Sequence, residues 1–195
     1  MKPIYNFLIK PKNKRYDNTK KINDTELILN TDISDHKFIS RQAIIHETPI
    51  TNGSNLTRGT ELYVHHNIFR RWYDVRGIER NSKSYFKDNL YFCEFDQIFL
   101  YKDNEDWKAN EGYCFVAPLA NEDDFSIEKE QSLTGIVKYT DNSNLLQIGD
   151  KVGFTPWSEY EFIINGEKLY RVMTKEISIK YEYKGKEKEY NPSWV

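Results

Sequence analysis

The side chains most able to do chemistry are scattered along the chain. His65-His66 has the residue type that binds transition metals, and Glu122 precedes the acidic pair Asp123-Asp124. Neighbouring side chains on a strand point to opposite faces, so consecutive histidines on a strand do not readily chelate one ion. The acidic run is typical of a solvated loop, and the sequence has no nucleophile elbow or phosphate-cradling glycine loop. The sequence therefore predicts a protein with no catalytic site, metal or cofactor of its own.

The two cysteines, Cys93 and Cys114, both lie inside apolar patterns typical of strands. A cysteine in such a position behaves as a small buried hydrophobic residue. A disulfide would require their strands to adjoin, and a reducing compartment disfavours it. Two cysteines without a partner at ligand spacing do not make a zinc site.

Net charge and apolar content limit the classes of partner. The formal net charge is -2 with a pI of about 6.1, so no overall field attracts nucleic acid. The basic clusters at 10–15 and 70–71 are local, and solvated loops explain them. No apolar run reaches the roughly 20 residues that cross a bilayer, and Asn6 and Lys10 interrupt any signal-peptide core. We therefore expect a soluble, cytoplasmic protein without nucleic-acid or membrane partners.

One apolar triplet, Leu27-Ile28-Leu29, lies in the long polar segment 11–41. A long irregular segment in a small domain is usually functional or disordered. The triplet has two interpretations: a docking segment for a partner, or an ordinary strand packed on its own domain. The shorter segment 121–133 carries Phe125-Ser126-Ile127, a weaker candidate for the same role.

The sequence predicts that the elements which position these residues occur twice. Four blocks recur in the same order: 5–9 with 113–117, 42–45 with 134–137, 59–64 with 149–154, and 90–100 with 169–179. The sequence therefore predicts two tandem domains, 1–103 and 112–183, joined by a polar linker at 104–111. The charged tail, 184–195, is expected to be loose or bound to a partner.

Composition indicates an all-β fold. Aromatic residues make up 15% of the chain, and aromatic and β-branched side chains suit pleated, half-buried surfaces. We expect strands at 4–10, 42–46 and 62–66, with closing strands within 84–101. Asn165-Gly166 predicts a tight hairpin in the second copy. Two small β-barrels fit this pattern, with Trp72-Tyr73 and Trp157 covering barrel ends or lining a subunit interface.

Several segments resemble GroES-type co-chaperonins. The segment 146–154 (LQIGDKVGF) is similar to that family's "V-K-V-G-D-x-V-x-F", and 163–170 (IINGEKLY) is similar to its "I-x-I-D-G-E-E-Y". Residues 176–179 (EISI) resemble its closing "D-I-L-A-I", and 4–11 lie where the family has its first strand. Leu27-Ile28-Leu29 falls where GroES carries an "I-V-L" tripeptide in its long loop.

The resemblance implies a fold and a function. It implies two GroES-like small barrels, the first with a mobile loop at about 11–41. Leu27, Ile28 and Leu29 would dock on a GroEL-type chaperonin, and the chains would form a ring, typically heptameric, that closes a folding chamber over an unfolded client. The turn that contains Pro49, Asn52, Gly53 and Asn55 lies where the family has its roof hairpin.

The first copy departs from the family pattern. Gly59-Thr60-Glu61 replaces Gly-Asp, and Gly59 precedes Leu90 by 31 positions where Gly149 precedes Leu169 by 20. The loop also lacks flanking glycines. These departures suggest a divergent member of the family, and we expect a bacteriophage protein that acts in a host cytoplasm. The alternative is a duplicated β-barrel structural or binding module of a viral or other oligomeric assembly, without chaperonin binding.

Overall fold

The computed structural model describes residues 2–23, 25–29, 31–33, 35–51, 53–123, 126–141, 145–182, 185 and 187–195, with the backbone alone at Lys20 and Lys21. These residues form antiparallel strands and short 3-10 helices, so the predicted all-β class is confirmed. The chain divides into two compact units, residues 1–106 and 107–195, called unit 1 and unit 2 below. None of the helices in the described part of the chain has the length and apolar character needed to span a membrane.

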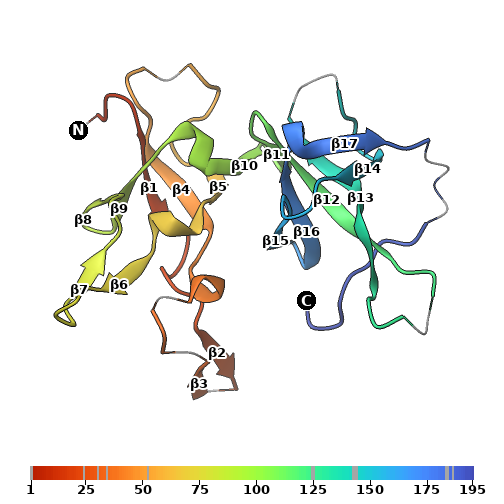
Figure 1. The fold of residues 1–195 in the computed structure, drawn as a ribbon. Coiled ribbons are helices and arrows are strands. Elements are labelled where there is room, and N and C mark those ends of the chain that lie inside the picture. The colour runs from red at the N-terminus through yellow and green to blue at the C-terminus, as the bar shows by residue number, and fades with distance from the viewer. Residues whose placement is uncertain are drawn as a thin grey trace. The chain divides into compact units, whose positions relative to one another are not determined.

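The main sheet of unit 1 is antiparallel and has the strand order β11-β10-β5-β4-β1-β9-β8 (Figure 1). Alternating burial along β4 and β9 places Ala43, Ile45, Tyr91 and Cys93 in one core, as period-two side-chain direction requires. The strands are β1 (Phe7–Pro11), β4 (Gln42–Glu47), β5 (Glu61–Val64), β8 (Tyr85–Lys87), β9 (Leu90–Cys93) and β10 (Ile98–Asp103). The last strand of the sheet, β11 (Asp106–Ala109), begins at the final residue of unit 1 and continues into the residues assigned to unit 2.

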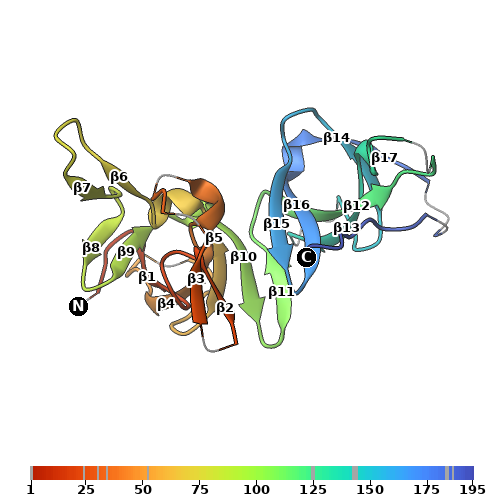
Figure 2. The same cartoon turned by 90° about the horizontal axis from the view of Figure 1, so that it is seen from below.

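Two further hairpins extend from unit 1. Strands β2 (Thr19–Ile22) and β3 (Thr25–Ile28) form one, and β6 (Arg71–Tyr73) and β7 (Glu79–Asn81) form the other. Both lie at the end of the unit opposite the N-terminus (Figure 1), and they diverge from each other in the second view (Figure 2). The short helices of unit 1 are η1 (His36–Phe38), η2 (His66–Ile68) and η3 (Phe95–Gln97).

Unit 2 has one six-stranded antiparallel sheet with the order β15-β16-β12-β13-β14-β17. The strand β12 is buried along almost its whole length, which explains its nearly continuous apolar sequence. The elements are β12 (Tyr113–Ala120), β13 (Glu130–Thr140), β14 (Lys151–Phe154), β15 (Tyr160–Ile164), β16 (Glu167–Met173), η4 (Thr174–Glu176) and β17 (Ile177–Lys180).

The two units share one topology. Read from the other end, the order in unit 2 is β17-β14-β13-β12-β16-β15, which matches β10-β5-β4-β1-β9-β8 in chain order and in neighbours. The registers also agree: Ala43 pairs with Leu62 as Gly135 pairs with Val152. The short helices η3 and η4 each connect equivalent strands. The internal repeat read from the sequence therefore corresponds to a repeated structure.

The sequence alignment of the first block is wrong by one residue. It equates Ile9 with Ala117, but Ile9 pairs with Tyr91 where Val116 pairs with Tyr170. The true equivalents place Pro11 opposite Ala43 and Pro118 opposite Gly135. Because side chains alternate along a strand, this shift exchanges the two faces of the equivalent strands.

Three features of the fold differ from the expectations. Each main sheet runs from one edge strand to another, so the described strands form antiparallel sheets and not closed barrels. The segment 104–111, expected as a linker, holds β11, which follows a turn at Asn104 with a positive φ of 57°. The segment 11–41, expected as an irregular loop, contains β2, β3 and η1.

The C-terminal tail packs on unit 2 and is not loose in its described part. Leu119 bridges to Glu189, and the Tyr190 N–H donates to the Pro118 carbonyl at 2.8 Å. The Asn191 side chain accepts from the Lys168 N–H at 3.0 Å and donates to the Gly166 carbonyl at 2.9 Å. These bonds satisfy backbone groups at the end of β12 and in the β15–β16 turn.

Candidate docking site on the β2–β3 hairpin

Two residues of the apolar triplet, Leu27 and Ile28, lie on β3 of the exposed β2–β3 hairpin, and Leu29 follows directly after the strand. Leu27, Ile28 and Leu29 are 51%, 62% and 49% exposed, so both faces of β3 are open to solvent. Leu27 and Ile28 pair with Lys20 and Thr19 of β2, and the Leu29 N–H donates to the Asn18 carbonyl at 2.8 Å. The interpretation of the triplet as a buried core strand is therefore wrong in this structure.

The base of the hairpin is closed by Tyr16, which is 6% exposed. Its backbone bridges to Ile39, and its hydroxyl donates to the Ile33 carbonyl at 2.7 Å. The same hydroxyl accepts the Arg71 N–H at 2.8 Å, and the Arg71 guanidinium lies 4.6 Å from the ring centre. Through its backbone and its hydroxyl, Tyr16 thus connects the beginning and the end of the segment 11–41 with each other and with strand β6.

An exposed ion pair and a hydrogen bond, both made by Lys14, lie on one side of the hairpin. The Lys14 ammonium donates to Glu26 at 2.5 Å and to the Thr19 hydroxyl at 3.3 Å. The hydrogen bond from Lys14 lowers the pKa of the Glu26 carboxyl. Both side chains are more than half exposed, so this ion pair contributes little to stability.

The turn expected as a roof hairpin connects β4 and β5, at the other end of unit 1. Pro49 is buried, whereas Gly53 and Asn55 are exposed; Asn52 lies outside the described residues. The N-terminal segment runs beside this turn, because the Ile50 N–H donates to the Pro3 carbonyl at 2.9 Å and the Thr51 hydroxyl donates to Ile4 at 2.8 Å. The turn is therefore anchored and not a free surface loop.

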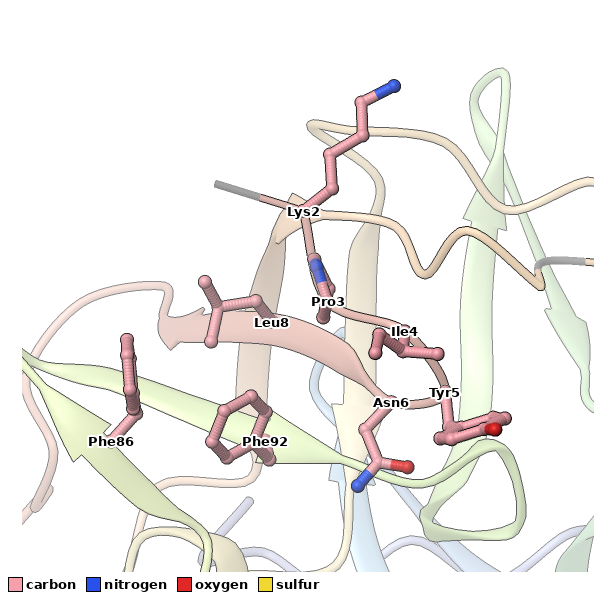
Figure 3. A pocket seen from close by; sticks show the side chains of 8 residues that line it. All are labelled: Lys2, Pro3, Ile4, Tyr5, Asn6, Leu8, Phe86 and Phe92. Atoms are coloured by element: carbon pink, nitrogen blue, oxygen red, sulfur yellow. The ribbon is translucent and has the colours of Figure 1, made fainter.

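An apolar pocket of about 340 Å³ lies beside this N-terminal segment. Figure 3 shows Leu8, Phe86 and Phe92 next to one another on strands β1, β8 and β9, with Pro3 and Ile4 along the rim. The Phe86 and Phe92 ring centres are 5.1 Å apart. In unit 2 the equivalent of Leu8 is Phe115, whose ring instead packs on Phe162 at 5.6 Å. The pocket is a second feature able to hold an apolar group.

Three histidines meet near the start of η2, which the sequence pattern does not predict. The chain leaves the strand at His65, so the rings of His65 and His66 stack at 4.6 Å and do not take opposite faces. The ring centre of His36 lies 5.5 Å from that of His66. Burial, together with the nearby charges of His65, Arg41, His36 and Arg70, lowers the pKa of His66 to about 3. Within the described residues, no group of three or more His, Cys, Asp or Glu side chains is arranged to hold a metal.

The cysteines are free and fully buried, as the sequence predicts. Burial raises the pKa of both thiols, to about 12 for Cys114. A thiolate is the reactive form, so neither side chain is suited to nucleophilic chemistry.

The second candidate loop carries less structure. Ile127 is 98% exposed, and Phe125 lies outside the described residues. The described parts of 121–129 form no strand that resembles β3.

The sequence points to Trp72-Tyr73 as a barrel cover or subunit interface, but it does not single out the whole β6–β7 hairpin as a docking surface. Trp72 and Tyr73 are 45% and 59% exposed and do not cover a core, and Trp157 is 95% exposed. The signal was the eleven extra residues between Gly59 and Leu90, which the structure places in this hairpin. Comparison with models of protein families, with characterised proteins and with solved structures gives no match.

Proposed function

We propose that this protein is a GroES-like co-chaperonin that docks on a GroEL-type chaperonin through the β2–β3 hairpin. The observation that carries the proposal is the open position of Leu27, Ile28 and Leu29 on a hairpin with a fixed base. The hairpin lies between β1 and β4, and the predicted roof turn lies between β4 and β5, in the order that the resemblance implies. In this proposal the sheets of the two units are divergent forms of the family's small barrel.

The energetics of the triplet suit reversible docking. Full burial of an aliphatic side chain of this size contributes about 1.5–3 kcal/mol, and three such side chains offset much of the entropy lost on association. The preformed hairpin lowers that loss relative to a disordered loop. A single hairpin would still bind weakly, and a ring of chains would bind tightly through effective concentration.

The proposed assembly is a ring that closes the folding chamber of the chaperonin over an unfolded client in the cytoplasm. Unit 1 carries the docking hairpin, and unit 2 is structural. The chain itself has no catalytic role, because the hydrolysis of ATP belongs to the partner.

The test is co-elution with a purified GroEL-type chaperonin in the presence of ATP or ADP. The variant Leu27→Ser/Ile28→Ser/Leu29→Ser should lose binding by about 100-fold or more, since each tenfold loss corresponds to about 1.4 kcal/mol. It should keep its thermal unfolding midpoint, because the three side chains are exposed. The matched control, Leu145→Ser, removes an exposed aliphatic side chain from unit 2 and should bind normally. Wild-type protein that never co-elutes would contradict the proposal.

A second candidate function is a binding or structural module in an oligomeric assembly, without a chaperonin partner. The pocket lined by Leu8, Phe86 and Phe92 favours it, because pockets of this size and apolar character hold ligands or inserted side chains. The two functions separate experimentally. Phe86→Ser would weaken assembly under the second candidate and leave chaperonin docking unchanged under the first.

A further inference from the structure

The β6–β7 hairpin is an addition to unit 1 with a well-fixed conformation. In unit 1 the hairpin lies in the connection between β5 and β8. The equivalent connection in unit 2, between β14 and β15, is short and covers only 155–159. The turn is held by the Asp74 carboxylate, which accepts from the N–H groups of Arg76 and Ile78 at 2.9 and 3.0 Å and from Arg80 at 3.0 Å. Gly77 supplies the positive φ of 73° that such a turn requires.

This hairpin exposes large apolar side chains in spite of its fixed turn. Trp72, Tyr73, Val75 and Ile78 are all exposed, and Val75 is completely so. In a hairpin this short, no core is available to cover them. Several large apolar side chains exposed on one short projecting element indicate an interaction surface more strongly than a single exposed residue does.

The bases of the two hairpins are joined by direct hydrogen bonds. The Arg15 guanidinium donates to the carbonyls of Phe69 and Arg70 at 2.5 and 3.0 Å, and to the Asn81 side chain at 2.6 Å. Phe69 and Arg70 precede β6, and Asn81 ends β7. Together with the bond from Arg71 to Tyr16, these contacts hold β2–β3 and β6–β7 in one arrangement.

The net positive charge in and around the β6–β7 hairpin indicates the kind of surface that it would bind. The segment 70–83 contains five cationic side chains, Arg70, Arg71, Arg76, Arg80 and Lys83, against two anionic ones, Asp74 and Glu79. Each anion pairs with one of these cations, Asp74 with Arg80 and Glu79 with Arg71, which leaves the segment with a net charge of +3 (5 cations minus 2 anions). A chain with net charge -2 therefore carries a local basic surface with exposed aromatic and aliphatic side chains. Its complement is an acidic surface with apolar grooves.

We propose that the β2–β3 and β6–β7 hairpins form one bipartite docking surface, and that β6–β7 binds an acidic, apolar-grooved surface of the chaperonin beside the groove that takes Leu27, Ile28 and Leu29. The inference rests on the proposed function and adds a second contact to it. The aliphatic pair Val75 and Ile78 favours a protein partner over a single-stranded nucleic acid, which would use the aromatic and basic side chains alone.

The experiment measures the affinity of the full chain for the purified chaperonin with ADP, at low and at moderate salt. The variant Val75→Ser/Ile78→Ser should weaken binding about tenfold or more at both salt concentrations. Arg76→Glu should weaken it mainly at low salt, because screening reduces the contribution of an exposed charge. The control, Trp157→Ala, removes a large apolar side chain that is 95% exposed in unit 2, and it should leave the affinity unchanged.

Each result decides the inference. Loss of affinity in both β6–β7 variants, with the control unchanged, supports the bipartite surface. Unchanged affinity in these variants, with loss in the Leu27/Ile28/Leu29 serine variant, overturns the bipartite surface and leaves the proposed function intact. Absence of wild-type binding overturns both. Tight binding of a fluorescent oligouridylate that Trp72→Ala and Arg76→Glu abolish, with no effect of Val75→Ser/Ile78→Ser on chaperonin affinity, assigns the hairpin to nucleic acid instead.

Discussion

Arg15 and Tyr16 are the side chains on which the arrangement of unit 1 depends most. Their contacts join residues separated by more than fifty positions, and each bond satisfies a backbone group at the base of a hairpin. The Arg15 guanidinium also lies 5.2 Å from the ring centre of Tyr91, and its burial lowers its pKa. A cation so enclosed acts as a structural link, because its carbonyl partners would lose their hydrogen bonds without it.

We predict that Arg15→Met destabilises unit 1 by about 1–3 kcal/mol, the cost of leaving buried polar groups without partners. Amide exchange should accelerate at residues 69–71 and 81. The comparison is Arg58→Met, since Arg58 makes an exposed ion pair with Glu47 that contributes little. Equal effects of the two substitutions in urea denaturation would contradict the structural role of Arg15.

His66 predicts a pH dependence of stability. Burial and its cationic neighbours hold the pKa of the folded state at about 3, whereas the unfolded chain takes up this proton near its ordinary value of 6.5. The unfolded state therefore binds more protons below pH 6.5, so stability is complete above that pH and declines as pH falls toward 3. The unfolding midpoint of unit 1 should drop between pH 7 and pH 5, and less steeply in His66→Gln. Parallel slopes would show that other groups cause the loss.

At the scale of elements, equivalent turns precede β5 and β14. Gly59 and Gly149 both have a φ of +91°, and each N–H donates to an equivalent carbonyl, Ile45 and Val137, at 2.9 and 2.8 Å. A Cβ at either position meets no atom within 4 Å, so a substitution is opposed by backbone conformation alone.

We therefore predict that Gly59→Ala and Gly149→Ala each cost about 1–2 kcal/mol, the penalty of a left-handed conformation for a residue with a Cβ. Each substitution should destabilise its own unit. Gly53→Ala is the control, because Gly53 has open space around it and no such positive φ. A cost for Gly53→Ala equal to the other two, measured by thermal unfolding, would refute the backbone explanation.

The sequence predicts some elements well because their signals are local. The blocks at 59–64 and 149–154 align correctly because a turn glycine fixes the register of the strand after it. The block containing Ile9 and Val116 aligns wrongly because β12 is almost continuously apolar and does not reveal which residues face the core. The pairing of both strands with their neighbours settles that register, with Ile9 opposite Tyr91 as Val116 is opposite Tyr170.

The candidate site was predictable in composition but not in exposure. An apolar triplet in a polar segment indicates either docking or core, and period-two alternation cannot say whether another element covers the strand. The covering elements and the Arg15 contacts are distant in sequence and leave no local pattern. The sequence marks the β6–β7 hairpin by Trp72-Tyr73, by the turn residue Gly77 and by a length difference between the repeats, but none of these signals shows that its apolar side chains are exposed.

At the scale of the whole molecule, the two units share one topology and differ in the segments added to it. Unit 1 adds two projecting hairpins with exposed apolar side chains, and unit 2 adds a tail that packs on its own sheet. In unit 2 the buried Lys168 ammonium donates to Glu130 at 2.6 Å, and Tyr170 donates to the same carboxylate at 2.7 Å. The hydroxyl of Tyr170 is half-buried there, and burial raises its pKa to about 12. The proposed division into a docking unit 1 and a structural unit 2 rests on this contrast between exposed hairpins and a self-packed tail.

The most direct measurement is hydrogen–deuterium exchange of the full chain with and without a GroEL-type chaperonin and ADP. We predict that binding slows amide exchange at residues 19–29, slows it less at 71–81, and leaves it unchanged in the described core of unit 2. Exchange at 19–29 that is identical with and without a bound chaperonin would contradict docking through the β2–β3 hairpin.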